Sequence, residues 1–211
     1  VKIKAKDRYF LRYFVLFLLL NCCLYLFIFH CHNWLPLEPT FHFNRQLDSF
    51  LPDSRLINGQ FNLLNNLSQY DAQWYLQLAQ QAYQSKQSFA FLPAYPLLLA
   101  ASNYLVKDPL LAAFIVSNVL LALCFALFYY LMTSFYQRGL VMKAAFLLFS
   151  FPFSIFLRSY FAEGLLLFLL ILFAFYWLKK KYFRAALVLG LMNITKANVF
   201  LLSFYFLFVV A

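Results

Sequence analysis

Three ionisable side chains stand in or beside strongly apolar sequence. They are Asp71 in QYDAQWYLQLAQQAY, Glu163 in FLRSYFAEGLLLFLL and Lys196 in LMNITKANVFLL. A charge within apolar, membrane-like sequence is costly and usually faces a cavity or a partner. A carboxylate at the mouth of such a cavity can act as a general base on an acceptor hydroxyl. A lysine in such surroundings calls for a phosphate or carboxylate partner, so these residue types are those of a polar site at a membrane edge.

The composition identifies the membrane. The chain is 65% hydrophobic and 11% charged, whereas soluble domains are about half apolar and about a quarter charged. Several apolar runs approach the roughly 20 residues that a helix needs to cross a bilayer. These runs are continuous and do not alternate as the strands of a barrel must. The sequence therefore predicts an all-α fold, a polytopic transmembrane helical bundle.

The basic residues indicate the orientation of this bundle. The net charge is +10, but the basic residues gather beside apolar runs, as they do in cytoplasmic loops. This distribution predicts membrane lipids as partners and no nucleic acid. The three clusters are Lys2, Lys4, Lys6, Arg8 and Arg12, then Arg138 and Lys143, then Lys179, Lys180, Lys181 and Arg184.

The charge distribution also orders the membrane segments. Residues 13–31 are expected to form the first crossing, with the N-terminus cytoplasmic. Residues 32–106 form an outer loop that carries interfacial and re-entrant helices and Asp71. Pro93 and Pro96 disfavour an uninterrupted crossing within 89–106, and further crossings follow in 110–211. The whole of 1–211 is predicted to be one domain, and its end inside an apolar run suggests a longer protein.

Residues 72–84 have helical spacing, with an apolar face opposite a face of glutamines. Such a helix can lie flat in the membrane interface. Asp71, at its start, has two compatible interpretations: a helix N-cap or a general base. The neighbouring rings of Tyr70, Trp74 and Tyr75 can partly desolvate this carboxylate and offer a stacking surface for a sugar.

Glu163 and Lys196 also have alternatives. Glu163 can pair with Arg158, five residues back, or act as a negative charge at a helix start. Lys196 can extend to an interface, but it lies about 18 Å of helix beyond the last basic cluster, close to mid-membrane. A phosphate or a carboxylate is its expected partner there.

Four segments resemble one known family. The segment YDAQWYLQLAQQAY resembles W-D-A-x-x-[FY]-L-x-I-A-x-x-G-Y of the GPI mannosyltransferase 2 (PIG-V-like) family. The segments FAFLPAYPLLL, SFPFSIFLRSYFAEGLLLFL and ITKANVFLL resemble its F-A-F-F-P-x-Y-P-L, S-P-A-S-x-F-x-x-x-x-Y-[ST]-E-x-L-F and L-T-R-S-N-G-L-L. The order and spacing agree over residues 70–202. The departures are Tyr70 for Trp, Gln81–Ala82 where a Gly is preferred, Lys196 for Arg and Val199 for Gly.

The resemblance implies a GT-C glycosyltransferase, a multi-pass enzyme that takes its sugar from a polyprenyl (dolichyl) phosphate donor and passes it to a lipid-linked or glycan acceptor. It implies that Asp71 occupies the catalytic acid position, and an inverting reaction then needs Asp71 as its one general base. Glu163, the second expected catalytic residue, could hold the acceptor, orient a cation or support Asp71. No metal ligand set is predicted, a divalent cation is left open, and an accessory membrane subunit is a further expected partner. The residues expected to bind substrate are Tyr70, Trp74, Tyr75, Tyr95, Arg158, Lys196 and Asn198.

The expected location is a bacterial plasma membrane or the eukaryotic endoplasmic reticulum, where the acceptor would resemble a GPI precursor. Family members are longer than this chain, so a C-terminal part is expected beyond residue 211. Two other classes remain open. A transporter or channel would use Asp71, Glu163 and Lys196 along its substrate path, and a non-catalytic membrane subunit would share the fold without the chemistry.

Overall fold

The computed structural model describes residues 5–31, 56–57, 60–61, 63–68 and 70–210. It is an all-α membrane protein, as predicted. Within these residues, two helices are long and apolar enough to span a membrane, Phe10–Cys31 and Pro109–Met132. Shorter apolar helices cover Ala94–Val106, Glu163–Leu178 and Ala197–Phe206.

The elements follow one another as helices with one small hairpin in which β1 and β2 pair antiparallel. In chain order they are α1 (Ala5–Cys31), β1 (Leu56–Ile57), β2 (Gln60–Phe61), α2 (Leu63–Asn66), α3 (Asp71–Gln81), η1 (Gln87–Ala90), α4 (Ala94–Val106), α5 (Pro109–Met132), α6 (Arg138–Ser150), η2 (Pro152–Ser154), α7 (Ile155–Arg158), α8 (Glu163–Leu178), α9 (Tyr182–Asn193), η3 (Ala197–Val199) and α10 (Phe200–Val210). The predicted outer segment 32–55 lies outside the described residues.

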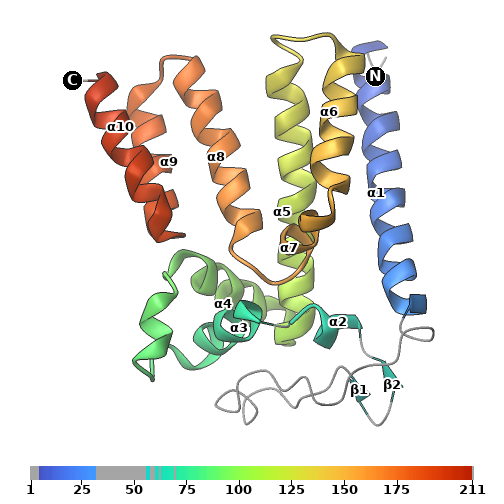
Figure 1. Cartoon of the computed structure of the whole chain (residues 1–211), viewed down its shortest axis with the longest axis vertical. Coiled ribbons are helices and arrows are strands. Elements are labelled where there is room, and N and C mark those ends of the chain that lie inside the picture. Colours follow the sequence, from blue (N-terminus) through green and yellow to red (C-terminus); the bar gives the residue numbers. More distant parts are fainter. Residues whose placement is uncertain (1–4, 32–55, 58–59, 62, 69, 211) are drawn as a thin grey trace.

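The long helices run side by side, and α3 and α4 lie across one end of them (Figure 1). The N-terminus and the C-terminus are both at the other end, together with the α5–α6 and α8–α9 connections (Figure 1). Helix α3 packs on α4, and α4 packs on α5. The two ends therefore differ: one carries an extra layer of helices, and the other carries the basic connections.

The apolar segment 89–106 stays at the α3 end. Its helix α4 begins after Pro93, and Pro96 lies in the first turn, where a missing backbone N–H breaks no helical hydrogen bond. Lys107 ends α4 with a left-handed φ of 60°. The Asp108 carboxylate then accepts hydrogen bonds from the backbone N–H groups of Leu110 and Leu111, both at 3.0 Å, and caps α5. The chain thus turns directly from α4 into the longest apolar helix of the bundle core.

The apolar run 143–161, which lies within the segment 110–211 where further crossings are expected, is divided in the structure. Helix α6 ends at Ser150, and η2 and α7 follow as short separate turns. Pro152 begins η2, and proline cannot donate the hydrogen bond that would continue α6. The break lets the segment after α7, which contains Tyr160, pack against buried residues of α3.

The predicted amphipathic helix over 72–84 is present as α3. Its buried residues are Ala72, Tyr75, Leu76 and Leu78. Ala72, Tyr75 and Leu76 belong to a cluster with Tyr95 and Leu99 of α4 and with Tyr160, which follows α7. Burial of this face holds the start of α3, where Asp71 lies, against α4 and α5.

Candidate active site

An ion pair joins two of the three charged residues that stand in apolar sequence. The Lys196 ammonium donates a hydrogen bond to Oε1 of Glu163. Glu163 is the first residue of α8, and Lys196 lies directly before η3. Their side chains are 32% and 33% exposed, so the pair stands at a boundary between the core and an open space. The expected pairing of Glu163 with Arg158 is not formed, since the partner of Glu163 is Lys196. The alternative position at a helix start is the one that Glu163 has.

Backbone hydrogen bonds bring distant segments to this pair. The N–H of Ala94, at the start of α4, donates to the carbonyl of Ile194 at 3.0 Å. The N–H of Tyr160 donates to the carbonyl of Leu67 at 3.4 Å, which ties the segment before α8 to the turn after α2. The start of α8 and the α9–α10 connection consequently lie at the α3/α4 end of the bundle (Figure 1).

Asp71 occupies the first turn of α3 and not its N-cap. Tyr70 is the capping residue, with a φ of 58°, and no side chain caps the helix. The N-cap interpretation of Asp71 is therefore wrong. A carboxylate in the first helical turn is still stabilised by the helix dipole, so α3 holds Asp71 in place without using its oxygens as a cap.

The electrostatics of Asp71 connect it to the ion pair. Partial burial raises the pKa of its carboxyl, the negative charge of Glu163 raises it further, and the positive charge of Lys196 lowers it. Asp71 is exposed as a whole residue, but its carboxylate lies close enough to both partners for their charges to act on it. Asp71 therefore lies within electrostatic range of the Glu163–Lys196 ion pair, and we refer to these three residues as the polar cluster.

One oxygen of this cluster has no hydrogen-bond partner among the residues that the structure describes. Oε2 of Glu163 is buried and accepts no hydrogen bond from them, although Oε1 is held by Lys196. A buried acceptor left unpaired costs about 1–3 kcal/mol. Oε2 is consequently a place where a hydroxyl from a bound molecule would gain a hydrogen bond that the protein does not supply.

Aromatic side chains border the cluster. Trp74 stacks on Phe91 with ring centroids 5.7 Å apart. Tyr75 meets the Phe91 ring edge-on, with ring centroids 5.2 Å apart. The Tyr83 hydroxyl donates to the backbone carbonyl of Phe91 at 2.7 Å. Phe91 therefore lies at the centre of this aromatic wall, although it is not among the site residues predicted from the sequence. Its place in FAFLPAYPLLL was the available signal.

Tyr75 connects the wall to the charges. Its pKa is raised by burial and by the negative charges of Glu163 and Asp71, so the phenol keeps its proton and remains able to donate a hydrogen bond. Tyr95, which is fully buried, meets the Tyr75 ring edge-on, with the ring centroids 5.2 Å apart. The Tyr95 hydroxyl is 3.3 Å from Oγ of Ser117, which anchors this stack to α5.

Arg158 lies apart from the cluster in a different network. It is 4% exposed, and its Nε donates to Oδ1 of Asn21 in α1 at 2.7 Å. Its terminal nitrogens donate to the carbonyls of Ser154 at 3.0 Å and Phe149 at 2.7 Å. The guanidinium thus joins α1 to the α6–α7 segment. Asn21, a polar residue inside an apolar stretch, was the missed signal for this network.

The remaining predicted residues have simple positions. Asn198 is exposed within η3, two residues after Lys196. Tyr70 is exposed directly before α3. Among the residues that the structure describes, no group of three or more His, Cys, Asp or Glu side chains could hold a metal ion. The gathered set is therefore two carboxylates, one ammonium group and an aromatic wall.

Comparison with known proteins gives one match. The family model described as "Mannosyltransferase (PIG-V)" matches residues 6–210. A search of curated proteins found no match, and a search of solved structures found none either.

Proposed function

Because the chain belongs to the mannosyltransferase (PIG-V) family, we propose that it is an enzyme that moves a mannose-type sugar from a polyprenyl-phosphate donor to a lipid-linked or glycan acceptor. Family membership makes it a membrane mannosyltransferase, an enzyme and not a transporter. The donor, the acceptor, the mechanism and the residues that carry it are the proposal. The observation on which it rests is the cluster of Asp71, Glu163 and Lys196.

Asp71 acts as the general base in this proposal. The acceptor O–H gives its proton to the Asp71 carboxylate while its oxygen attacks the anomeric carbon of the donor sugar. The bond between that carbon and the phosphate oxygen breaks, and the configuration inverts. A carboxylate with a raised pKa takes up a proton more readily than an ordinary one, which suits this role.

Lys196 and Glu163 supply the electrostatics. The departing lipid phosphate carries the charge that develops in the transition state, and a positioned cation stabilises it. Lys196 is the cation of the cluster, and Glu163 fixes its position. The unpaired Oε2 of Glu163 accepts a hydrogen bond from a second hydroxyl of the acceptor, so that the single proton of the reacting hydroxyl remains available to Asp71.

The aromatic wall binds the sugar, and buried residues support it. Trp74 and Tyr75 offer a ring face and a phenol beside Asp71, with Tyr70 and Asn198 at the exposed margin. We assign supporting roles to Tyr95 and Arg158, which the sequence analysis expected to touch substrate. Both are buried, and their polar atoms are engaged with Ser117 and with the Asn21 network.

A divalent cation has a weak ligand set here. Asp71 and Glu163 are the two carboxylates of the cluster, and Lys196 already neutralises Glu163. These residues do not fit a dedicated metal site, which normally needs further oxygen ligands. We therefore derive no step through a cation, and we expect transfer to persist when divalent cations are chelated.

The proposed topology places the cluster on the outer or lumenal side. The basic connections beside α6 and α8 lie at the end opposite α3 and α4 (Figure 1), and an excess of lysine and arginine marks cytoplasmic loops. This orientation supports an N-terminus in the cytoplasm and a polyprenyl-phosphate sugar presented at the outer surface. The same proposal includes the host membrane, which is a bacterial plasma membrane or the endoplasmic reticulum. It also includes an accessory membrane subunit as a partner.

The test is sugar transfer from synthetic polyprenyl-phosphate mannose in membranes that carry the full-length protein. Asp71→Asn should reduce transfer by about 10²–10⁴-fold, the usual contribution of a general base, at unchanged membrane abundance. Asp108→Asn is the matched control, because asparagine also caps a helix well, and it should leave transfer intact. Unchanged transfer with Asp71→Asn would exclude Asp71 as the base and would make Glu163 the next candidate.

A non-catalytic subunit of the same fold would give a different pattern. No transfer would be detected with either form, and both would insert equally well. Transfer by the unmodified protein alone excludes that class directly.

A further inference from the structure

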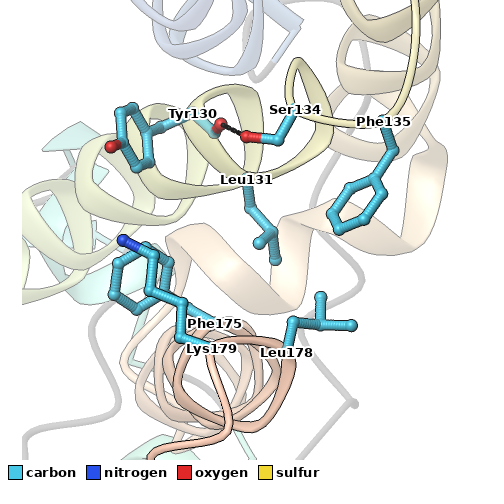
Figure 2. A pocket seen from close by; sticks show the side chains of 7 residues that line it. All are labelled: Tyr130, Leu131, Ser134, Phe135, Phe175, Leu178 and Lys179. Carbon is cyan, nitrogen blue, oxygen red and sulfur yellow. Dashed lines mark hydrogen bonds between the residues drawn. The ribbon is translucent and has the colours of Figure 1, made fainter.

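A second site lies at the opposite end of the bundle from Asp71. A cavity of about 210 Å³ opens between the last turn of α5, the turn that follows it and the last turn of α8. Its walls come from Tyr130, Leu131, Phe135, Phe175 and Leu178, and Lys179 stands at its side (Figure 2). The cavity is thus mainly apolar, with one cation.

The cation is available to a ligand. The Lys179 ammonium lies 4.2 Å from the centroid of the Phe175 ring, and the Tyr130 ring borders the same ring at 6.1 Å. Within the described part of the chain, no carboxylate pairs with Lys179; the ion pair described there is that of Lys196 with Glu163. An ammonium over a ring is only weakly held, so it can exchange this contact for an anion.

The surroundings add positive charge. The basic residues near Lys179 are exposed. They are Lys180 and Lys181, which follow it directly, Arg184 three residues after Lys181, and Arg138 at the start of α6 on the neighbouring connection. The three lysines project from a helix end with defined geometry: the N–H of Lys181 donates to the carbonyl of Tyr176 at 2.9 Å, and that of Lys180 to Trp177 at 2.8 Å. This hydrogen-bond pair is a Schellman motif, so the backbone from which these lysines extend has a defined conformation.

The depth of the cavity identifies the kind of ligand. It lies where the apolar span Pro109–Met132 ends, which is the level of lipid headgroups if that helix crosses the bilayer. A molecule that fills it must offer apolar groups to leucine and phenylalanine and a negative charge to Lys179. Anionic phospholipids of the cytoplasmic leaflet combine these properties and are attracted by clustered lysine and arginine.

We propose that this cavity binds the headgroup of an anionic phospholipid, with the lipid phosphate on Lys179 and the glycerol region against Leu131 and Leu178. The site requires the basic end to face a membrane surface, but it does not depend on the reaction proposed for Asp71. Its role is to hold α8 at a fixed depth.

The test is lipid retention by the full-length protein in nanodiscs of equal phosphatidylglycerol and phosphatidylcholine, measured by native mass spectrometry after transfer to detergent. The unmodified protein should retain phosphatidylglycerol preferentially. Lys179→Gln should weaken this retention about fivefold, which corresponds to about 1 kcal/mol for one lysine near the surface. Lys107→Gln, an exposed lysine at the end of α4, is the matched control and should have no effect.

Two further measurements separate a built site from diffuse attraction. Ser134 also lines the cavity. Ser134→Trp places a large side chain there without changing the charge, and it should weaken retention as much as Lys179→Gln does. If Ser134→Trp has no effect while Lys180→Gln equals Lys179→Gln, attraction is diffuse and the proposal is wrong. Displacement of phosphatidylglycerol by polyprenyl phosphate at equal concentration would instead make this a substrate site and also overturn it. Sugar transfer, measured in parallel, should survive all of these changes.

Discussion

Lys196 and Glu163 are separated by 33 positions in the chain and form an ion pair at the start of α8. Asp71 lies near enough for both charges to act on its carboxyl, with opposite signs. The pair thus has two functions in the proposed site. It fixes the geometry of a carboxylate and a cation, and it sets the basicity of a third residue.

The pH dependence of transfer is the first consequence. Asp71 must be deprotonated to act as a base, so transfer is lost as the pH falls through its pKa. Because that pKa is raised, the acidic limb of kcat/KM should lie above the value of about 3.9 of an exposed aspartate. The measurement is the pH profile of transfer by the unmodified protein, with the same amount of protein in the membrane at each pH.

Substitutions in the ion pair should move this limb in opposite directions. Glu163→Gln removes a charge that raises the pKa of Asp71, so the limb of the residual activity should move to lower pH. Lys196→Gln removes a charge that lowers it, so the limb should move to higher pH. Shifts in the same direction, or no shift in either variant, would show that another group controls the profile.

The ion pair should also appear in stability. A double-mutant cycle of Glu163→Gln and Lys196→Gln should give a coupling energy of about 0.5–3 kcal/mol, the range for residues in direct contact. The measurement is thermal unfolding of the four proteins in one detergent. Lys107 provides the control: it lies at the far end of α4 from Ala94, so Lys107→Gln combined with Glu163→Gln should be additive.

Arg158 should matter for stability more than for binding. Arg158→Gln removes the guanidinium donors to the Asn21 side chain and to the Ser154 carbonyl. The Phe149 carbonyl also loses its Arg158 donor but keeps the hydroxyl of Ser154 at 2.9 Å. Each buried acceptor left unpaired costs about 1–3 kcal/mol, so the midpoint of thermal unfolding should fall markedly. If the variant instead keeps its stability and only raises KM for the donor, Arg158 binds substrate as the sequence first suggested.

Lys180 offers a gain of stability at the basic end. Its φ of 56° lies in the left-handed region, which costs an L-residue roughly 1–2 kcal/mol and glycine nothing. Lys180→Gly should therefore raise stability by up to about 1 kcal/mol after the greater chain entropy of glycine is included. Thermal unfolding of this variant beside Lys181→Gly, which alters a residue outside that region, gives the comparison. Equal effects of both would contradict the explanation by backbone strain.

Some features of this protein follow from the sequence alone. Its apolar runs determine an all-α membrane protein, because so much apolar surface cannot be buried inside a chain of this size. The period of residues 72–84 predicts the amphipathic helix α3, since the buried residues Tyr75 and Leu78 recur at helical spacing. The short motifs around Asp71, Glu163 and Lys196 identify the family, and the family model matches almost the whole chain.

Other features were decided by the tertiary structure. The sequence left the partner of Glu163 open between Arg158 and a cavity, because residues five apart on a chain can face each other or not. Arg158, which follows the break between α6 and α7, donates to Asn21 of α1 instead. The hydrogen bond between Ala94 and Ile194 ties the α9–α10 connection to α4, and Lys196 of that connection pairs with Glu163. Such pairings join segments that are distant in the chain. They depend on how whole helices pack, which no local pattern of residues specifies.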